Sequence, residues 1–259
     1  APDAKGGQTS YKVDPADPIQ GNGGANLPPG IGGTIECGPL DQADIDNTRE
    51  DMLLFDMPAV EEELVLTGPM DAEIYVSSSA VDTDFMVRIS DVWNDEKGTV
   101  RLLQDNGVRM RWREDTLEPV YMEEGTVYKV QMSLWNTSYV LAPGHSLRVS
   151  IQSSNNPRFG VNPQNGLLLT DPTYPGESVV ATNTLYHSAD YPSRVILPVI
   201  TTPKSEALPE VDVLKEIKHE FGDILKGKVM DKVKDFLDKK IHHKGLVEKI
   251  RDRIHKHNH

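Results

Sequence analysis

Short runs of alternating apolar and polar residues dominate the middle of the chain. In residues 70–77 (MDAEIYVS) and 146–151 (SLRVSI) the two kinds of side chain take turns, as in a strand that packs on one face and is wet on the other. Turn-forming Gly, Pro, Asn and Asp separate such runs at the spacing typical of all-β folds. The pattern predicts strands over residues 61–68, 71–79, 84–93, 108–113, 126–135, 146–152 and 193–199.

Two sheets made from these strands would pack face to face as a β-sandwich spanning residues 51–203. No strong helical pattern of ten or more residues interrupts this region, which argues against folds that alternate strands with helices. Ahead of it, residues 1–50 are rich in Gly, Pro, Asp and Asn, which break both helices and strand pairing. We therefore expect an extended N-terminal arm laid over an all-β domain.

The pattern becomes helical after Pro203. Apolar residues recur every three or four positions through residues 204–259, which predicts two or three amphipathic helices as a C-terminal extension. A helix of this kind must bury its apolar stripe, on its own sandwich, on a second copy or on another surface. The face expected to contact a partner consists of Leu214, Ile217, Phe221, Leu225, Val233, Leu237 and Ile241.

Composition narrows the class of partner. The 259 residues are 37% hydrophobic and carry a net charge of -13, and no apolar run approaches the ~20 residues of a membrane-spanning helix. Residues 1–203 hold 13 Lys and Arg against 29 Asp and Glu, an acidic balance that argues against nucleic acid. Residues 204–259 hold 14 Lys and Arg against 11 Asp and Glu. Acidic residues that are nearly as frequent weaken attraction to an anionic membrane, so a protein contact is favoured for this segment. The single cysteine, Cys37, excludes an internal disulfide.

Catalytic and metal motifs are absent from the sequence. No G-x-S-x-G nucleophile elbow occurs, and the nearest approach, residues 144–148 (GHSLR), lacks the second glycine. His145 and Ser146 are adjacent, so in a strand they would point to opposite faces and could not act as base and nucleophile. No catalytic residue, metal or cofactor is assigned. Two groups of acidic residues do not match the sequence pattern of a calcium-binding loop. They are expected to be polar residues of loops and strand edges: Asp82, Asp84 and Asp91, and Asp41, Asp44 and Asp46.

Two surface features suggest further roles. Asn136 begins an N-x-S sequon, a candidate glycosylation site if the chain passes through a glycosylating compartment. The sequon, the first residue Ala1 in place of Met and the acidic surface favour an extracellular or secretory location. Aromatic residues of the β region would suit a carbohydrate-binding face, but core packing is the favoured interpretation. They are Trp93, Trp112, Trp135, Tyr121, Tyr128 and Tyr139.

Several segments stand in a fixed order along residues 8–200. They are YKVDPADPIQGNGG (11–24), GPLDQ (38–42), NTREDML (47–53), LTGP (66–69), DTDFMVR (82–88), GVRMR (107–111), GHSLR (144–148), SSNNPRFGVN (153–162) and YPSR (191–194). In this order they resemble the C-terminal domain of Xaa-Pro dipeptidyl-peptidase and cocaine-esterase-like hydrolases. Residues 204–259 fall outside the resemblance.

The resemblance implies a jelly-roll, galactose-binding-like β-sandwich. In the complete enzymes this domain packs against an α/β-hydrolase domain and helps to shape the substrate pocket and the oligomer contacts. Their Ser, Asp and His triad lies upstream of it, in a part that this chain does not have, so no catalytic residue is carried over. The charged residues in the matching motifs are expected to hold loops by bidentate hydrogen bonds. They are Arg49, Asp51, Arg109, Arg111 and Arg158.

Three functions stay open at this point. The first is a non-catalytic module for protein association or assembly, acting on a protein partner or as a homo-oligomer through the N-terminal arm and the helical tail. The second is the C-terminal part of a split or processed serine hydrolase, an Xaa-Pro dipeptidyl-peptidase or esterase, whose catalytic part is another chain. The third, a carbohydrate-binding module, rests on fold analogy alone. In all three the chain is expected to be catalytically silent by itself.

Overall fold

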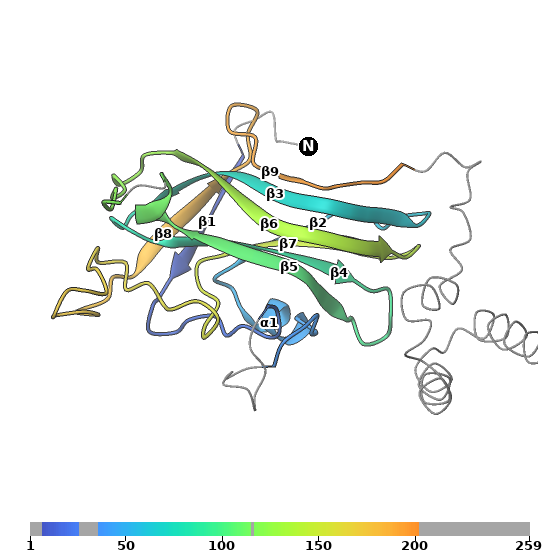
Figure 1. Cartoon of the computed structure of the whole chain (residues 1–259), viewed down its shortest axis with the longest axis horizontal. Helices are drawn as coiled ribbons and strands as arrows, with labels where there is room; N and C mark the ends of the chain where they lie inside the picture. Colours follow the sequence, from blue (N-terminus) through green and yellow to red (C-terminus); the bar gives the residue numbers. More distant parts are fainter. Residues whose placement is uncertain (1–6, 26–35, 115–116, 202–259) are drawn as a thin grey trace, which may run out of the picture. The chain divides into compact units, whose positions relative to one another are not determined.

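Two antiparallel sheets form a β-sandwich, as the alternation of apolar and polar residues predicts (Figure 1). The computed structural model describes residues 7–25, 36–114 and 117–201. The five-stranded sheet has the order β1-β8-β3-β6, with β9 also paired to β3. Its strands are β1 (Gln8–Val13), β8 (Ala181–Tyr186), β3 (Leu64–Ser78), β6 (Tyr128–Leu141) and β9 (Arg194–Ile196). The four-stranded sheet has the order β2-β7-β4-β5, from β2 (Leu53–Asp56), β7 (Ser146–Gln152), β4 (Asp84–Val92) and β5 (Val100–Arg109).

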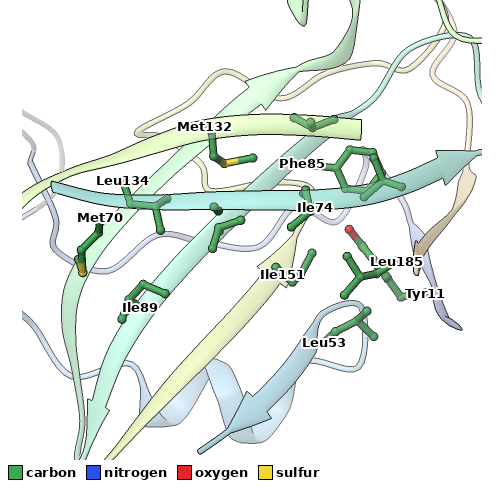
Figure 2. Close-up of a cluster of buried hydrophobic side chains, with 14 of the residues drawn as sticks. Tyr11, Leu53, Met70, Ile74, Phe85, Ile89, Met132, Leu134, Ile151 and Leu185 are labelled. Atoms are coloured by element: carbon green, nitrogen blue, oxygen red, sulfur yellow. The ribbon is translucent and has the colours of Figure 1, made fainter. Parts of the chain in front are cut away.

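The hydrophobic core lies between the two sheets. Ile74 of β3 and Leu134 of β6 face Phe85 and Ile89 of β4, and each of the four is at most 2% exposed. Figure 2 shows these side chains pointing into the space between the strands. Burying one such side chain stabilises the fold by roughly 1.5–3 kcal/mol, so the alternation in the sequence is the main determinant of the sandwich.

Most of the predicted strands are confirmed, with shifted bounds. Residues 84–93 and 146–152 correspond to β4 and β7. The predicted strands 61–68 and 71–79 are one strand, β3, whose register shifts between Pro69 and Asp71 at a bulge. The predicted strand 126–135 continues to Leu141 as β6, and only the first part of 193–199 pairs regularly, as β9.

The predicted strand 108–113 is wrong. β5 ends at Arg109, and the 3-10 turn η1 (Met110–Trp112) follows. Tertiary contacts fix this turn: the backbone N–H of Met110 donates to Thr83 O, and that of Arg111 donates to the Asp82 carboxylate. Local alternation carries no information about these partners, so the sequence pattern misplaces the end of the strand.

The N-terminal arm is more integrated than an extended segment laid over the domain. Its residues Gln8–Val13 form β1, the edge strand of the five-stranded sheet, in register with β8. A short helix, α1 (Ala43–Thr48), also lies within the arm and packs on the four-stranded sheet (Figure 1). The Gly- and Pro-rich composition of the arm therefore does not exclude regular structure in these two segments.

The predicted C-terminal helices, including the face from Leu214 to Ile241, lie outside the described residues. The helical extension stays a prediction, and so does the jelly-roll connectivity. Within the described residues, no helix has the length and apolar character needed to cross a membrane.

Candidate functional site

The arginines of the family-like motifs hold loops through carboxylates, as expected. Arg109 places Nε and Nη2 each 2.9 Å from the two carboxylate oxygens of Asp84. Arg111 pairs with Asp82 through Nε at 2.8 Å and donates from Nη1 to Leu167 O at 2.7 Å. The bidentate Arg109–Asp84 pair and the Arg111–Asp82 pair fix the ends of β4 and β5 to the loop that follows residue 160, because the same arginines donate to Gly160 O and Leu167 O. The hydrogen bonds to carboxylates and loop carbonyls expected of the motif arginines are present at Arg109 and Arg111.

Two further motif arginines, Arg49 and Arg158, also bind carboxylates. Arg49 donates to both carboxylate oxygens of Asp51, at 2.8 and 2.6 Å, and to both of Asp17, at 3.0 Å. Arg158 pairs with Asp105 of β5. Arg49 therefore links Asp17 of the arm to Asp51, just before β2, by charge-assisted hydrogen bonds.

A buried charge cluster, missed by the sequence analysis, attaches α1 to the outer face of the four-stranded sheet. The Arg88 guanidinium, from the middle of β4, pairs with Asp46 of α1, and both side chains are at most 4% exposed. Arg148 of β7 donates to the same carboxylate at 3.0 Å. The lone charge inside the apolar run FMVRIS (85–90) was the sequence signal that a buried partner exists.

Several of the acidic residues expected at loops and strand edges are buried. Asp82, Asp84, Asp91 and Asp46 are at most 6% exposed, and Asp46 lies in α1 instead of a loop or strand edge. Burial raises the pKa of Asp84, against the opposing effect of its Arg109 partner. Each of the four carboxylates binds protein hydrogen-bond donors. Among the described residues, no group of three or more His, Cys, Asp and Glu side chains is arranged to hold a metal ion.

His145 packs beside a buried carboxylate. It donates through Nδ1 to Asp91 at 3.0 Å, and its ring lies 5.6 Å from that of Trp93. Tyr139 and Trp93 also donate to Asp91, at 2.7 and 2.8 Å. His145 therefore packs against Trp93 and Asp91 at the end of β4. Burial and the bond to Asp91 raise the pKa of Tyr139, which therefore stays protonated at neutral pH.

The aromatic residues divide between core and surface. Tyr128 and Tyr139 pack against the core, as favoured from the sequence. Trp135, Tyr121 and Trp112 are 61%, 41% and 40% exposed, so the core interpretation is wrong for these three. Asn136, the candidate glycosylation site, is exposed on β6, beside Trp135. Its modification stays a prediction.

One side of the sandwich is open. A groove of about 530 Å³ lies between the two sheets near their edge strands, lined mainly by apolar side chains. Ile74, Ile151 and Leu185, which converge between the sheets in Figure 2, form its floor. We call it the inter-sheet groove and define it by Phe55, Ile74, Val149, Ile151, Leu185 and Val195.

The start of β1 lies at the rim of this groove. His187, which contributes to the lining, donates from its backbone N–H to Gly7 O at 2.9 Å. Its Nε2 lies 3.0 Å from Thr9 Oγ1 at the start of β1, and its ring meets the edge of Phe55 at 6.1 Å. Sequence reasoning missed this site, although the apolar run Met52 to Phe55 was a signal for the strand that borders it.

The opposite side of the sandwich is closed. There β5 and β6 lie together, and two amide side chains of β5 cover backbone groups of β6. Gln104 donates to Asn136 O and Asn106 donates to Ser133 O, each at 2.8 Å. Side chains that occupy the free carbonyls of an edge strand prevent another chain from pairing there. The two sides of the domain therefore differ: side chains cover backbone carbonyls at β5 and β6, whereas an apolar groove lies on the other side.

Comparison with known proteins agrees with the fold and the motifs. The family model of the X-Pro dipeptidyl-peptidase C-terminal non-catalytic domain matches residues 1–196. Cocaine esterase from Rhodococcus sp. (strain MB1 Bresler) is 35% identical over 196 residues, which cover 74% of this chain and 32% of that protein.

Solved structures show the same relation. An aminopeptidase from a marine sediment Thaumarchaeota archaeon aligns with a TM-score of 0.68 at 27% identity, over 77% of this chain and 34% of that one. An alpha-amino acid ester hydrolase aligns with a TM-score of 0.63 at 27% identity, over 75% and 33%. The chain thus spans about a third of the length of these relatives. It belongs to the family of X-Pro dipeptidyl-peptidase C-terminal non-catalytic domains.

Proposed function

We propose that this chain is an association domain that docks onto the α/β-hydrolase catalytic domain of a serine esterase or peptidase. The observation that carries the proposal is the extent of the match. The relatives are named as an esterase, an aminopeptidase and an ester hydrolase, and this chain corresponds to about a third of each. The chemistry would therefore be supplied by a catalytic domain, in the same polypeptide or in another, and this domain would supply a rigid surface.

The described residues suit such a role. Buried ion pairs such as Arg88–Asp46 and Arg111–Asp82 hold the loops and α1 in place. A surface fixed in this way loses little conformational entropy on association. We also propose the jelly-roll connectivity for the sandwich, and a location outside the cytosol for the assembly.

Capture of an active serine hydrolase tests the proposal. Tagged full-length chain would be mixed with a soluble extract of the source cells that has been treated with a biotinylated fluorophosphonate. We expect a labelled protein with a G-x-S-x-G motif to co-purify in a defined stoichiometry and to hydrolyse an ester or an aminoacyl substrate. Recovery of the chain as a homogeneous homo-oligomer without a labelled hydrolase would contradict the proposal and support assembly with itself.

A further inference from the structure

We propose that Asn106 is a site of spontaneous covalent modification, at which the backbone nitrogen of Gly107 attacks the side-chain amide and converts the asparagine to aspartate and isoaspartate. The sequence contains three Asn-Gly steps, at residues 22–23, 106–107 and 165–166. The fold holds these steps in different geometries, and the second is the one arranged for the reaction. This inference concerns the sandwich itself and does not depend on the proposed function.

The attacking nitrogen lies outside the hydrogen-bonded ladder of its sheet. The N–H of Met110 donates to Thr83 O, and hydrogen-bonded pairs alternate with non-hydrogen-bonded pairs along antiparallel strands. Gly107 stands opposite Met86, three positions further along the same register, and so belongs to a non-hydrogen-bonded pair. Its N–H therefore points to the free edge of β5, where it donates to Asn106 Oδ1 at 2.9 Å.

The amide of Asn106 is held beside that nitrogen. Its Nδ2 donates to Ser133 O of β6 at 2.8 Å, while its Oδ1 accepts from Gly107. Because Oδ1 is bonded to Cγ, the same contact brings the nitrogen close to the carbon that it attacks. Both residues are partly exposed to water, and glycine has no side chain to shield its nitrogen. Reacting groups already in contact lower the entropic barrier to closing the five-membered ring.

The reaction consumes water and needs no other reagent. The Gly107 nitrogen loses its proton to water or hydroxide and forms a bond to Asn106 Cγ, the bond from Cγ to Nδ2 breaks, and Nδ2 leaves as ammonia after taking up a proton from solvent. Water then opens the resulting succinimide ring. Addition at Cγ gives aspartate, whereas addition at the backbone carbonyl carbon gives isoaspartate. Nothing is oxidised or reduced.

The third Asn-Gly step is held away from this geometry. Asn165 Oδ1 accepts from the N–H of Leu167, one residue beyond Gly166, at 3.0 Å. Its Nδ2 donates to Pro175 O and Glu177 O, at 2.7 and 2.9 Å. Three hydrogen bonds therefore direct the amide past the nitrogen that would have to attack it.

The first Asn-Gly step is shielded from water at the attacking residue. Gly23 is buried, and Asn22 Nδ2 donates to Asp41 O at 2.7 Å. A buried backbone nitrogen has little water available to accept its proton, so ring closure is slow there. The three dipeptides are chemically identical, and the fold alone selects Asn106.

Conversion of Asn106 removes one of the two amides that cover β6. Aspartate has no side-chain N–H to donate to Ser133 O, and its carboxylate oxygens repel that carbonyl oxygen. A carbonyl of an edge strand that loses its cover becomes available for pairing with another chain. The modification therefore opens the closed side of the sandwich.

Peptide mapping of the full chain by mass spectrometry tests the site. The purified chain would be incubated at mildly alkaline pH, either folded or in urea, and aspartate and isoaspartate would then be quantified at residues 22, 106 and 165. In the folded chain we expect residue 106 to convert about tenfold faster than either of the others, because its contact with Gly107 is preformed. In urea the three steps should convert at similar rates.

Variants test the route and its consequence. Asn106→Gln keeps an amide but requires a larger ring, so we expect the release of ammonia from the folded chain to fall to the level of the other two steps. Asn106→Asp reproduces one product, and Asn136→Asp adds the same charge at an exposed residue of β6. We expect Asn106→Asp to lower the midpoint of urea unfolding more than Asn136→Asp does, because only the first loses a hydrogen bond to β6.

Each part of the proposal has an outcome that overturns it. Equal conversion at the three steps of the folded chain, or the same pattern folded and in urea, would mean that the fold does not select Asn106. Aspartate without isoaspartate at residue 106 would exclude the succinimide route. Equal unfolding midpoints for Asn106→Asp and Asn136→Asp would exclude the loss of cover on β6. The mapping uses the unmodified chain, so it decides the site even if a variant fails to fold.

Discussion

The substitution Asp46→Asn tests how the arm and α1 are held on the sandwich. Asp46 is the carboxylate shared by Arg88 and Arg148, and it has no exposed side-chain surface. Asparagine has nearly the same shape but carries no charge, so it leaves the Arg88 guanidinium buried without its counter-ion. Burial already lowers the pKa of Arg88, against the effect of Asp46, because desolvation disfavours the charged form.

Removing one partner of a buried pair costs about 3–5 kcal/mol, against a total stability of roughly 5–15 kcal/mol for a domain. Asp56→Asn is the matched control, because Asp56 is the other carboxylate bound by Arg148. The side chain of Asp56 is 45% exposed. An exposed pair contributes at most about 1 kcal/mol. Urea unfolding of the full chain, followed by tryptophan fluorescence, would give the free energy of unfolding of each variant.

Equal free energies of unfolding for Asp46→Asn and Asp56→Asn would refute the reasoning, because they would mean that the buried pair is solvated in the folded protein. The double variant Arg88→Met with Asp46→Leu removes both charges and replaces them with apolar groups. We expect it to recover much of the loss, since a buried pair is commonly no more stabilising than well-packed apolar residues.

Three further predictions concern the backbone, the pH response and the core. Trp135 has a φ of 69°, a left-handed conformation, at the β6 side of the bulge. Trp135→Gly should therefore be more stable to urea than Trp135→Ala by about 1 kcal/mol, and equal stability would contradict the strain. The hydrogen bond from Lys129 and that from Gln131 lower the pKa of Glu73. The charged Glu73 carboxylate therefore stabilises the folded protein at neutral pH, and this contribution is lost as the pH falls below about 4.3. In thermal melts at several pH values, the melting temperature of Glu73→Gln should therefore fall less at acid pH than that of the unmodified chain. An unchanged fall would exclude Glu73 as its source. Phe85 has no exposed surface, so Phe85→Ala should cost about 3–5 kcal/mol. Leu117→Ala, at a residue 98% exposed, should cost less than about 0.5 kcal/mol, and similar losses for the two would contradict the core assignment.

The sandwich was predictable because its long strands alternate clearly. In β3, β4 and β7 the inward positions are apolar, and tertiary structure only adjusts their ends. Strands without this alternation, such as β8, were missed. β8 (ATNTLY) buries Asn183 with no exposed surface, because its amide donates to Thr83 and Ser153. A polar residue in a short segment indicates a loop in the sequence pattern, unless its hydrogen-bond partners are known.

The inter-sheet groove could not be predicted from the sequence. The motif arginines were found because they stand in family-like segments, and their carboxylate partners follow in the structure. The groove, in contrast, combines Phe55 with Leu185 and Val195, which lie far apart along the chain. Only the packing of two sheet edges brings them together, and no local pattern reports that arrangement. Residues 204–259 were predicted as the contact element, and that prediction stays untested.

Reaction of the chain alone with a fluorophosphonate is the most direct test of the central claim, which is that this domain associates with a catalytic partner and performs no acyl transfer itself. The account predicts an unchanged intact mass for the purified full chain after incubation, and covalent labelling of the co-purified hydrolase under the same conditions. A stoichiometric adduct on this chain, together with turnover of an ester or proline-dipeptide substrate, would contradict it.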